Sequence, residues 1–577
     1  MIAAVGVFAY SQFWAKKSQP ILKEADKFLL ADFENKTGDE EFDRILRQPL
    51  AVSLEQSPFL TLVPDGQIRQ TLQQMEKKAD EPLSYEIARE IAQRRGIKAF
   101  LKGTIETRGV QYLLTLETFS TETGESVAKE QVESKNKETV MKSLGEAASQ
   151  MREKLGESLA SIKRLDAPLQ ESTTNSLEAL RSFTIGSNAV SEGKNDVAIK
   201  HFERAIELDT NFFAAYINIA IAYNNKGQVS QAQKFVEKAY TLRDRATTRE
   251  KLKVTDNYHA FITGDAEKNI ETLELYRQTY PRDIVGAVNL GAVYTQIGKF
   301  NKSEEYARIA MSLDPTSTIP YLNLGKALNL QTRYDEAKIV FEEAINRKFE
   351  SPQIQKGLFT VAFAKGNEAE IQRQIELLKK QEEDSALMIQ GNPLIFAGKW
   401  REYQKVLNQA IAMIEKDLPD VAADYASQVA VNSAALGKCK EAIDYQNRAL
   451  KYERGQAVMQ DASLTFALCD GDTEKIISEL KQKYPQNTVV NKMWLPIANA
   501  ALALKDSPEK TLEFLEITRQ YEGGTYFWDN YLRGQAYLKL KKNDFGDFRV
   551  SKNNPKSRMG NSLTAFRPSA LGTFPRL

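Results

Sequence analysis

Two short motifs contain the residue types that phosphoryl transfer requires. A Val-Ala-Ile-Lys tetrapeptide ends at Lys200, and an Asp-Phe-Gly tripeptide begins at Asp544. In protein kinases, such a lysine pairs with the ATP phosphates and such an aspartate holds magnesium. The motifs therefore raise the question of whether this chain transfers phosphate.

The rest of that catalytic machinery is missing from the sequence. Kinase chemistry also needs a glycine-rich loop before the lysine and a His-Arg-Asp loop before the aspartate. No Gly-x-Gly-x-x-Gly precedes Lys200, and neither His201 nor His259 is followed by Arg-Asp. Apolar residues around Lys200 recur at spacings of three and four, which predicts a helix instead of a strand. We therefore interpret both motifs as chance matches, and we predict no catalytic residue, no metal ligand and no cofactor.

The length and charge of the chain set broad limits on its class. Its 577 residues are enough for several domains or for one long repeat array. The chain has 78 Lys and Arg residues against 77 Asp and Glu residues. This balance provides no general basic field, and we therefore predict no nucleic-acid partner. Cys439 and Cys469 fall in helical patterns, where we expect buried small apolar residues rather than a disulfide framework.

The N-terminal segment is apolar and uncharged from residue 1 to 14, and Lys16 and Lys17 follow. A helix that spans a membrane needs about 20 apolar residues, so the segment is short for a complete span. We interpret residues 1–15 as the end of a transmembrane helix; the alternative is a short hydrophobic tail. This interpretation predicts a single-pass protein of the cell membrane, tethered through its N-terminal helix.

Residues 27–165 have the pattern of a small α/β domain. The expected strands are 27–33, 59–64, 98–109, 110–124 and 126–134, and the expected helices are 42–56 (kinked at Pro49), 66–75, 84–96 and 137–162. Their order predicts a sheet with helices covering one face. Asp32, Glu34 and Asp39 cluster after the first strand; we interpret them as a solvated loop, with a metal or substrate site as the alternative.

A 34-residue period begins near residue 177. Large and small side chains recur at equivalent places in 179–212, 213–246, 284–317 and 318–351. Small residues let two antiparallel helices approach closely, and large residues fill the remaining gaps. The pattern resembles the tetratricopeptide repeat. We predict a mostly α protein in which about ten helical pairs over 177–545 stack into a superhelix after the α/β domain.

The sequence after residue 545 departs from the repeat pattern. Residues 546–577 contain no acidic residue after Asp547, and they show no helical period. Two interpretations stay open. One is a disordered basic tail, and the other is a tail that is not native sequence because the reading frame shifts.

Four segments, 29–65, 87–105, 154–162 and 173–186, resemble a region of bacterial membrane serine/threonine kinases with tetratricopeptide C-termini, known from Acidobacteria. In that family the kinase domain precedes the membrane segment, and the α/β and repeat domains follow it, outside the cytoplasm. The resemblance implies that the kinase domain is absent from this chain and that the C-terminal region is extracytoplasmic. The two lysines after the apolar run depart from this picture, because they favour a cytoplasmic side.

The combined interpretation is a non-enzymatic module that binds a protein or peptide, as the sensor or scaffold half of a transmembrane signalling protein. First helices of tetratricopeptide units line a concave surface, and three units carry asparagine at the sixth position: Asn218, Asn289 and Asn323. The resemblance to the repeat family implies that these amides bind the backbone of an extended peptide. Lys326 offers an ammonium group for a ligand carboxylate.

Alternatives to this interpretation stay open. The three asparagines can instead form bonds within or between repeats. The whole chain can instead be an enzyme of unknown class with a site in the α/β domain, or a structural assembly scaffold.

Overall fold

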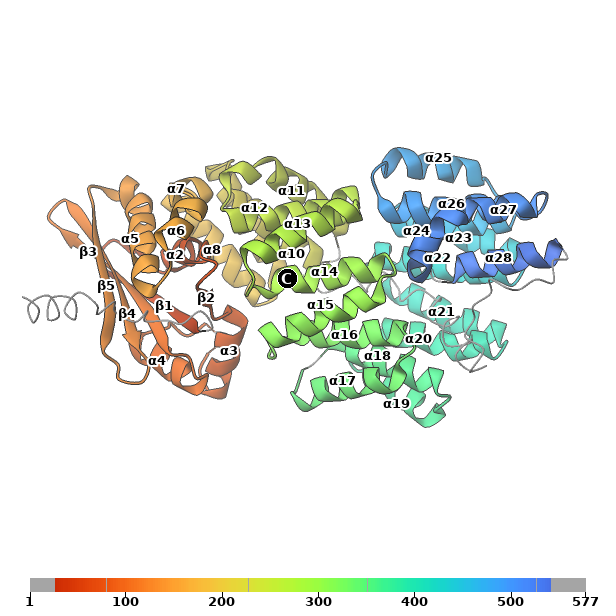
Figure 1. Ribbon diagram of the computed structural model, residues 1–577, viewed down its shortest axis with the longest axis horizontal. Coiled ribbons are helices and arrows are strands. Elements are labelled where there is room, and N and C mark those ends of the chain that lie inside the picture. The colour runs from red at the N-terminus through yellow and green to blue at the C-terminus, as the bar shows by residue number, and fades with distance from the viewer. Residues whose placement is uncertain (1–25, 79, 227, 350, 526, 541–577) are drawn as a thin grey trace, which may run out of the picture. The chain divides into compact units, whose positions relative to one another are not determined.

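The computed structural model describes residues 26–540 except for residues 79, 227, 350 and 526 (Figure 1). These residues form two compact units. The first unit contains the described residues as far as Tyr258 together with Thr279–Arg282, and the second contains His259–Gln278 and the described residues from Asp283 onward. The predictions for residues 1–15 and 546–577 lie outside the described residues.

The first unit begins with a five-stranded sheet in the order β2-β1-β3-β4-β5, in which β1 is parallel to both of its neighbours. The other neighbouring strands, β3 with β4 and β4 with β5, are antiparallel. The elements are β1 (Lys27–Lys36), η1 (Glu40–Phe42), α2 (Arg47–Leu54), β2 (Thr61–Leu62), α3 (Asp65–Gln74), α4 (Tyr85–Arg94), β3 (Ala99–Arg108), β4 (Gln111–Ser120), β5 (Ser126–Ser134), η2 (Lys137–Thr139), α5 (Val140–Leu155), α6 (Leu159–Leu165) and α7 (Leu169–Ser172).

Helices lie against both faces of this sheet, whereas the sequence predicted helices over one face (Figure 1). Side chains alternate between the two faces of a strand. Phe28 and Leu30 of β1 belong to the core that contains α2 and α5, whereas Leu29 and Ala31 belong to the core that contains α3 and α4. The apolar run at the start of β1 is therefore continuous because both of its faces are buried.

Two local details differ from the prediction. The single helix expected over 137–162 is divided, because Gly156 adopts a φ of 119°, a left-handed conformation in which glycine commonly ends a helix. Pro49 does not kink α2. It lies in the first turn, where a backbone N–H has no partner within the helix, so the missing N–H of proline removes no bond.

The core of the α/β part continues into the first repeats. One apolar cluster contains Leu144 of α5 and Leu169 of α7 together with Phe183 of α8 and Phe202 of α9. An ion pair of 2.8 Å between Glu55 and Arg249 adds a polar contact between the sheet part and α12. These shared contacts explain why the sheet and the first helical pairs belong to one compact unit.

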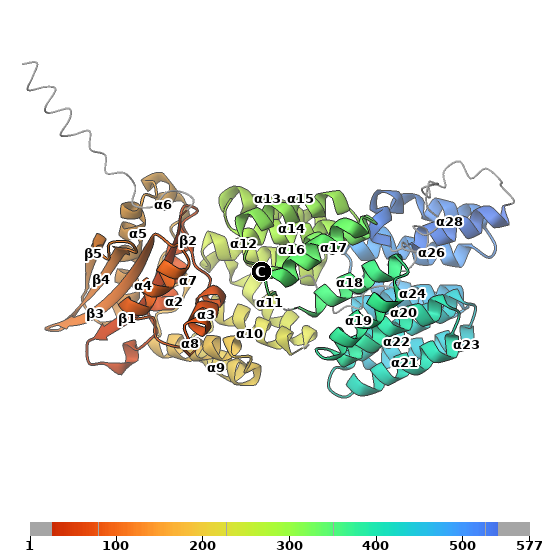
Figure 2. The ribbon, with the colours of Figure 1, turned by 90° about the horizontal axis from the view of Figure 1, so that it is seen from below.

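Ten successive pairs of α-helices, followed by the single helix α28, form most of the rest of the described chain. They are α8 (Leu177–Ser191), α9 (Asn195–Leu208), α10 (Phe213–Asn225), α11 (Val229–Thr241), α12 (Thr248–Tyr258), α13 (Ala266–Thr279), α14 (Ile284–Gln296), α15 (Phe300–Leu313), α16 (Thr318–Leu330), α17 (Tyr334–Asn346), α18 (Pro352–Ala364), α19 (Glu368–Lys379), α20 (Glu383–Phe396), α21 (Trp400–Ile414), α22 (Pro419–Ala435), α23 (Cys439–Tyr452), α24 (Gln456–Leu468), α25 (Thr473–Lys483), α26 (Leu495–Ala503), α27 (Pro508–Phe514) and α28 (Trp528–Lys539). Figure 2 shows α20 to α23 lying side by side. The predicted mostly α fold with about ten helical pairs is confirmed.

Close approach between helices explains the small residues of the repeat. A Cβ atom on Gly325 of α16 would lie 2.4 Å from the ring of Phe341 in α17, and one on Gly357 of α18 would lie 2.3 Å from the same ring. Gly186 of α8 is in similar contact with Phe202 of α9. Each large ring fills the space that a glycine leaves, and this pairing is the physical basis of the 34-residue period.

The two cysteines are joined, which corrects the expectation that they are separate apolar residues. Cys439 is the first residue of α23 and Cys469 follows the last residue of α24. Stacking of adjacent repeats brings these two helix ends together, with the Cα atoms 5.1 Å apart, and a disulfide links them. The sequence spacing alone did not indicate this contact, because it depends on how one repeat stacks on the next.

The prediction of a single-pass membrane protein is also corrected. Within the part of the chain that the structure describes, no helix is both long enough and apolar enough to cross a membrane. Residues 1–15, to which the prediction assigned the partial helix, lie outside that part.

Candidate functional site

The four predicted site residues all lie on first helices of helical pairs. Asn218 lies on α10 of the first unit, Asn289 lies on α14 of the second unit, and Asn323 and Lys326 lie on α16 of the second unit. First helices line the concave surface of a helical solenoid, where such proteins bind their partners. The exposure of the four residues differs, and we describe them in turn.

Asn218 is the accessible asparagine of the three. Its side chain is half-buried, and its Nδ2 atom donates a hydrogen bond of 2.9 Å to the carbonyl oxygen of Ala214, one turn earlier in α10. Its Oδ1 atom accepts no hydrogen bond from the described residues. The amide therefore offers one N–H and a carbonyl oxygen to a ligand.

The surface beside Asn218 combines apolar and amide groups. Ile221 is 44 % exposed, although it lies in the middle of a helix. Asn224 and Asn225 are exposed one turn further along, and Asn225 donates to Asn195 of α9 over 3.3 Å. Ile221 was not among the predicted site residues. An isoleucine one turn beyond the sixth-position asparagine, on the same side of the helix, is the signal that identifies it.

Asn289 and Asn323 are enclosed. Their side chains are 0 % and 3 % exposed, and every residue of α14 from Val285 to Val293 is buried. The Nδ2 atom of Asn323 donates to the carbonyl oxygen of Val288 in α14 over 3.4 Å. This bond joins two successive first helices. The peptide-binding role of both residues stays a prediction.

Lys326 is half-buried on α16. Burial lowers the pKa of its ammonium group to about 8. Burial thus works against the charged form that recognition of a carboxylate requires. On the same helix Asn329 donates to the carbonyl oxygen of Gly357 in α18 over 3.1 Å, which fixes the stacking of the next repeat.

The three acidic residues of the predicted cluster have partners within the α/β part, and Asp32 and Glu34 lie in β1 itself, whereas only Asp39 follows it. Glu34 forms an ion pair of 2.6 Å with Lys102, and this hydrogen bond holds the pKa of the carboxyl group below its usual range against the opposing effect of burial. Asp39 forms one of 2.7 Å with Lys137. Asp32 accepts a hydrogen bond of 2.8 Å from the backbone N–H of Leu83. Among the described residues, no three His, Cys, Asp or Glu side chains are grouped as metal ligands would be.

The lysine of the Val-Ala-Ile-Lys motif lies on α9, so it is on a helix, as its sequence pattern predicts. The Asp-Phe-Gly motif at Asp544 lies outside the described residues. Lys200 therefore belongs to a repeat helix.

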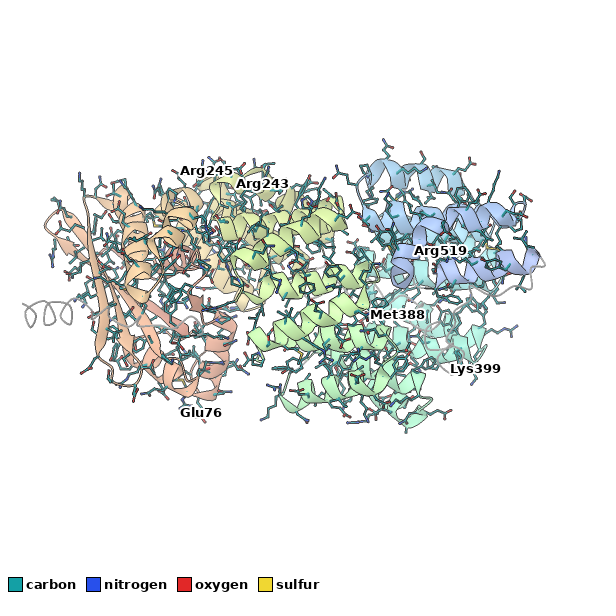
Figure 3. The ribbon with its side chains drawn as sticks, viewed as in Figure 1. Glu76, Arg243, Arg245, Met388, Lys399 and Arg519 are labelled. Atoms are coloured by element: carbon teal, nitrogen blue, oxygen red, sulfur yellow. A yellow bond between two sulfur atoms is a disulfide. The ribbon has the colours of Figure 1, made fainter. Side chains whose placement is uncertain are left out.

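Two arginines lie together in η3 (Arg243–Arg245), the short helix after α11 (Figure 3). The guanidinium group of Arg243 lies 4.0 Å from the ring centroid of Tyr240, and it donates a hydrogen bond of 2.8 Å to the carbonyl oxygen of Tyr240. Tyr240 in turn stacks on Tyr258. These contacts hold Arg243 against the end of α11.

Comparisons with known proteins identify the repeats. Models of the tetratricopeptide repeat match residues 182–212, 201–234 and 320–350. They indicate no enzyme family, and no curated protein sequence matches the chain. None of these results identifies the kinase-associated family that the sequence resembles. The repeats support a module for protein–protein interaction or scaffolding.

Parts of the chain are similar to solved structures. The C-terminal domain of LpoB from Salmonella enterica is 17% identical, covers 22% of this chain and 92% of its own, and has a TM-score of 0.19. PilW, a type IV pilus biogenesis factor, is 17% identical in sequence. The match covers 35% of this chain and 93% of the PilW chain, with a TM-score of 0.30. A tetratricopeptide repeat protein from Parabacteroides merdae is 14% identical in sequence. The match covers 42% of this chain and 98% of that protein's chain, with a TM-score of 0.33.

Proposed function

We propose that this chain is a non-enzymatic scaffold that binds an extended peptide of a protein partner on the first helices of its repeats. In the first unit, the binding surface centres on Asn218 of α10. The observation that carries the proposal is the accessible amide of Asn218, whose Oδ1 atom accepts no hydrogen bond from the described residues, with the exposed side chain of Ile221 one turn further along the helix.

The chemistry of this surface suits an extended peptide. A side-chain amide both donates to a carbonyl oxygen and accepts from an N–H. It can therefore form hydrogen bonds with a peptide backbone whatever side chains the peptide carries. Ile221 supplies apolar contact, and Asn224 supplies a second amide one turn along the helix. Selectivity for a sequence then comes from the apolar contacts, and affinity comes in part from the backbone bonds.

For the role of this binding in the cell, we propose the sensor or scaffold part of a signalling protein. The support is the resemblance of segments such as 29–65 and 173–186 to the kinase-associated region. A test joins residues 26–540 to the kinase domain of a member of that family and measures autophosphorylation with and without bound peptide. An autophosphorylation rate that is the same with and without bound peptide would contradict the sensor role.

Replacing Asn218 by alanine is expected to weaken peptide binding about fivefold, which corresponds to about 1 kcal/mol for one lost amide pair. The probe is an immobilised array of unstructured random dodecapeptides, and the affinity of the best peptides is measured for each variant. The thermal midpoint is expected to change little, because among the described residues this side chain bonds only to its own helix.

Asn301→Ala is the matched control, because Asn301 is an exposed asparagine on α15, a second helix. This variant is expected to bind the same peptides as the unaltered chain. Equal binding by all three proteins, or an equal loss in both variants, would contradict the proposed site.

A further inference from the structure

Loops from the first and last repeats of the second unit contact each other. The residues that make this contact are called the clasp here: Gly264, Gly298, Asn487, Thr488, Gly523 and Gly524. The backbone N–H of Thr488 donates to the carbonyl oxygen of Gly264 over 3.0 Å, and the N–H of Ala266 donates to the hydroxyl of Thr488 over 3.1 Å. These bonds join the start of α13 to the segment that follows α25.

The second contact of the clasp is between glycine backbones. A Cβ atom on Gly298 would lie 2.2 Å from the backbone nitrogen of Gly524, and one on Gly523 would lie 2.7 Å from the carbonyl oxygen of Gly298. Such an approach is possible only without side chains. The turn glycines Gly366 and Gly398 have similar positive φ values, yet nothing lies within 4 Å of their Cβ positions. Close contact therefore distinguishes Gly298 from equivalent turns.

Irregular helices adjoin each part of the clasp. Among the described residues, the π-helices are η4 (His259–Thr263), which ends directly before Gly264, and η5 (Val490–Trp494), which follows Thr488 closely. The 3-10 helix η6 (Glu516–Thr525) contains Gly523 and Gly524. Such segments interrupt regular helices most often at functional sites and hinges. The repeat geometry thus departs from regularity where the two ends of the array meet.

The closure also has an apolar core. One cluster of buried side chains contains Leu273, Val288 and Val293 from the start of the array. The same cluster contains Met493 and Trp494 of η5, together with residues of α26, η6 and α28. Val288 is the neighbour of Asn289 in α14. The contact between the ends of the array therefore covers the helix that carries one of the predicted peptide-binding asparagines.

We infer that the clasp controls access to the first helices of the second unit, so that it must open before an extended peptide reaches Asn289 and Asn323. This inference rests on the proposed function, because it concerns the same kind of ligand. It explains why Asn218 is accessible while Asn289 and Asn323 are enclosed at the same position of the repeat. The clasp makes the second unit a peptide site that is closed by its own chain.

The test compares Gly298→Ala with Gly366→Ala in the full chain, each combined with Asn289→Cys. Both alanines force a residue with a side chain into a left-handed turn, but only the one at 298 meets Gly524. The readout is the rate at which iodoacetamide alkylates the cysteine at position 289. Cys439 and Cys469 do not react, because they are joined in the disulfide. We expect alkylation at least tenfold faster in the Gly298→Ala protein.

Equal alkylation rates in the two proteins would overturn the inference. If Gly298→Ala prevents folding, Thr488→Val is the second variant, because it removes the acceptor for the Ala266 N–H and keeps the shape of the side chain. It too is expected to accelerate alkylation, and an unchanged rate would count against the clasp. No peptide is needed for this readout. If the cysteine is alkylated at the expected rates but the chain binds no array peptide, the proposed function is refuted. The inference that the clasp limits access to position 289 is then still supported.

Discussion

Replacing Arg152 by alanine is expected to lower the free energy of unfolding of the first unit by about 3–5 kcal/mol, the cost of leaving a buried charge without its partner. Arg152 is 0 % exposed. Its Nε atom donates to Glu157 over 2.8 Å, and one terminal nitrogen donates to Asp166 over 2.7 Å. Urea unfolding, followed by circular dichroism, measures the change.

Arg164→Ala is the control, because Arg164 is exposed in the same segment, on α6. It is expected to unfold like the unaltered protein. A double variant in which Arg152 is methionine and Glu157 is leucine is expected to recover much of the loss, because it leaves no unpaired charge in the core. A loss below about 1 kcal/mol for Arg152→Ala would show that the ion pair is not buried as described.

The same pair predicts a dependence on pH. Burial acts to raise the pKa of Glu157, but the hydrogen bond and the charge of Arg152 outweigh it, so the pKa lies below its usual range. A lowered pKa in the folded state means that the pair stabilises the unit above the unfolded pKa of about 4.3, and that this stabilisation is lost as the pH falls through the lower folded value. Arg152→Ala is expected to remove this part of the acid sensitivity.

Replacing both Cys439 and Cys469 by serine is expected to lower the free energy of unfolding of the second unit by about 3–4 kcal/mol. The disulfide closes a loop with a sequence separation of 30 residues, and the expected loss follows from the entropy that the closed loop removes from the unfolded chain. The measurement is urea unfolding of the oxidised chain and of the serine variant.

A reducing agent provides the internal control for the disulfide. It is expected to bring the unaltered chain to the stability of the serine variant and to leave that variant unchanged. Equal stability of the oxidised chain and the serine variant would contradict the assignment of a stabilising link between α23 and α24.

The helical pairs were predictable because their cause is local. A glycine such as Gly325 and a ring such as Phe341 lie 16 positions apart in the chain, within one helical hairpin, so their pairing leaves a repeating pattern in the sequence. The β3–β4–β5 meander was predictable for the same reason, since its strands are neighbours in the chain. Gly156 shows the limit of this reasoning, because a single glycine in a helical pattern does not reveal that it ends the helix.

The exposure of the sixth-position asparagines could not be predicted from their spacing. The repeat spacing predicts that Asn218 and Asn289 lie on the same face of their helices. It does not predict which residues cover that face. The apolar cluster around α14, the helix of Asn289, includes Met493 and Trp494, which are far away in the chain, and spacing within one repeat does not reveal such contacts. The disulfide was missed for a related reason, because it joins ends of helices from different repeats.

The most direct test of the peptide-binding surface is photocrosslinking from α10. A benzoylphenylalanine replaces Ile221 in one protein and Ile339 in another; Ile339 is 64 % exposed on α17, a second helix. Each protein is irradiated with the best peptide from the array, and crosslinked peptide is quantified by mass spectrometry. Crosslinks are expected from position 221, and few are expected from position 339. Equal crosslinking from both positions, or crosslinking from position 339 alone, would contradict it.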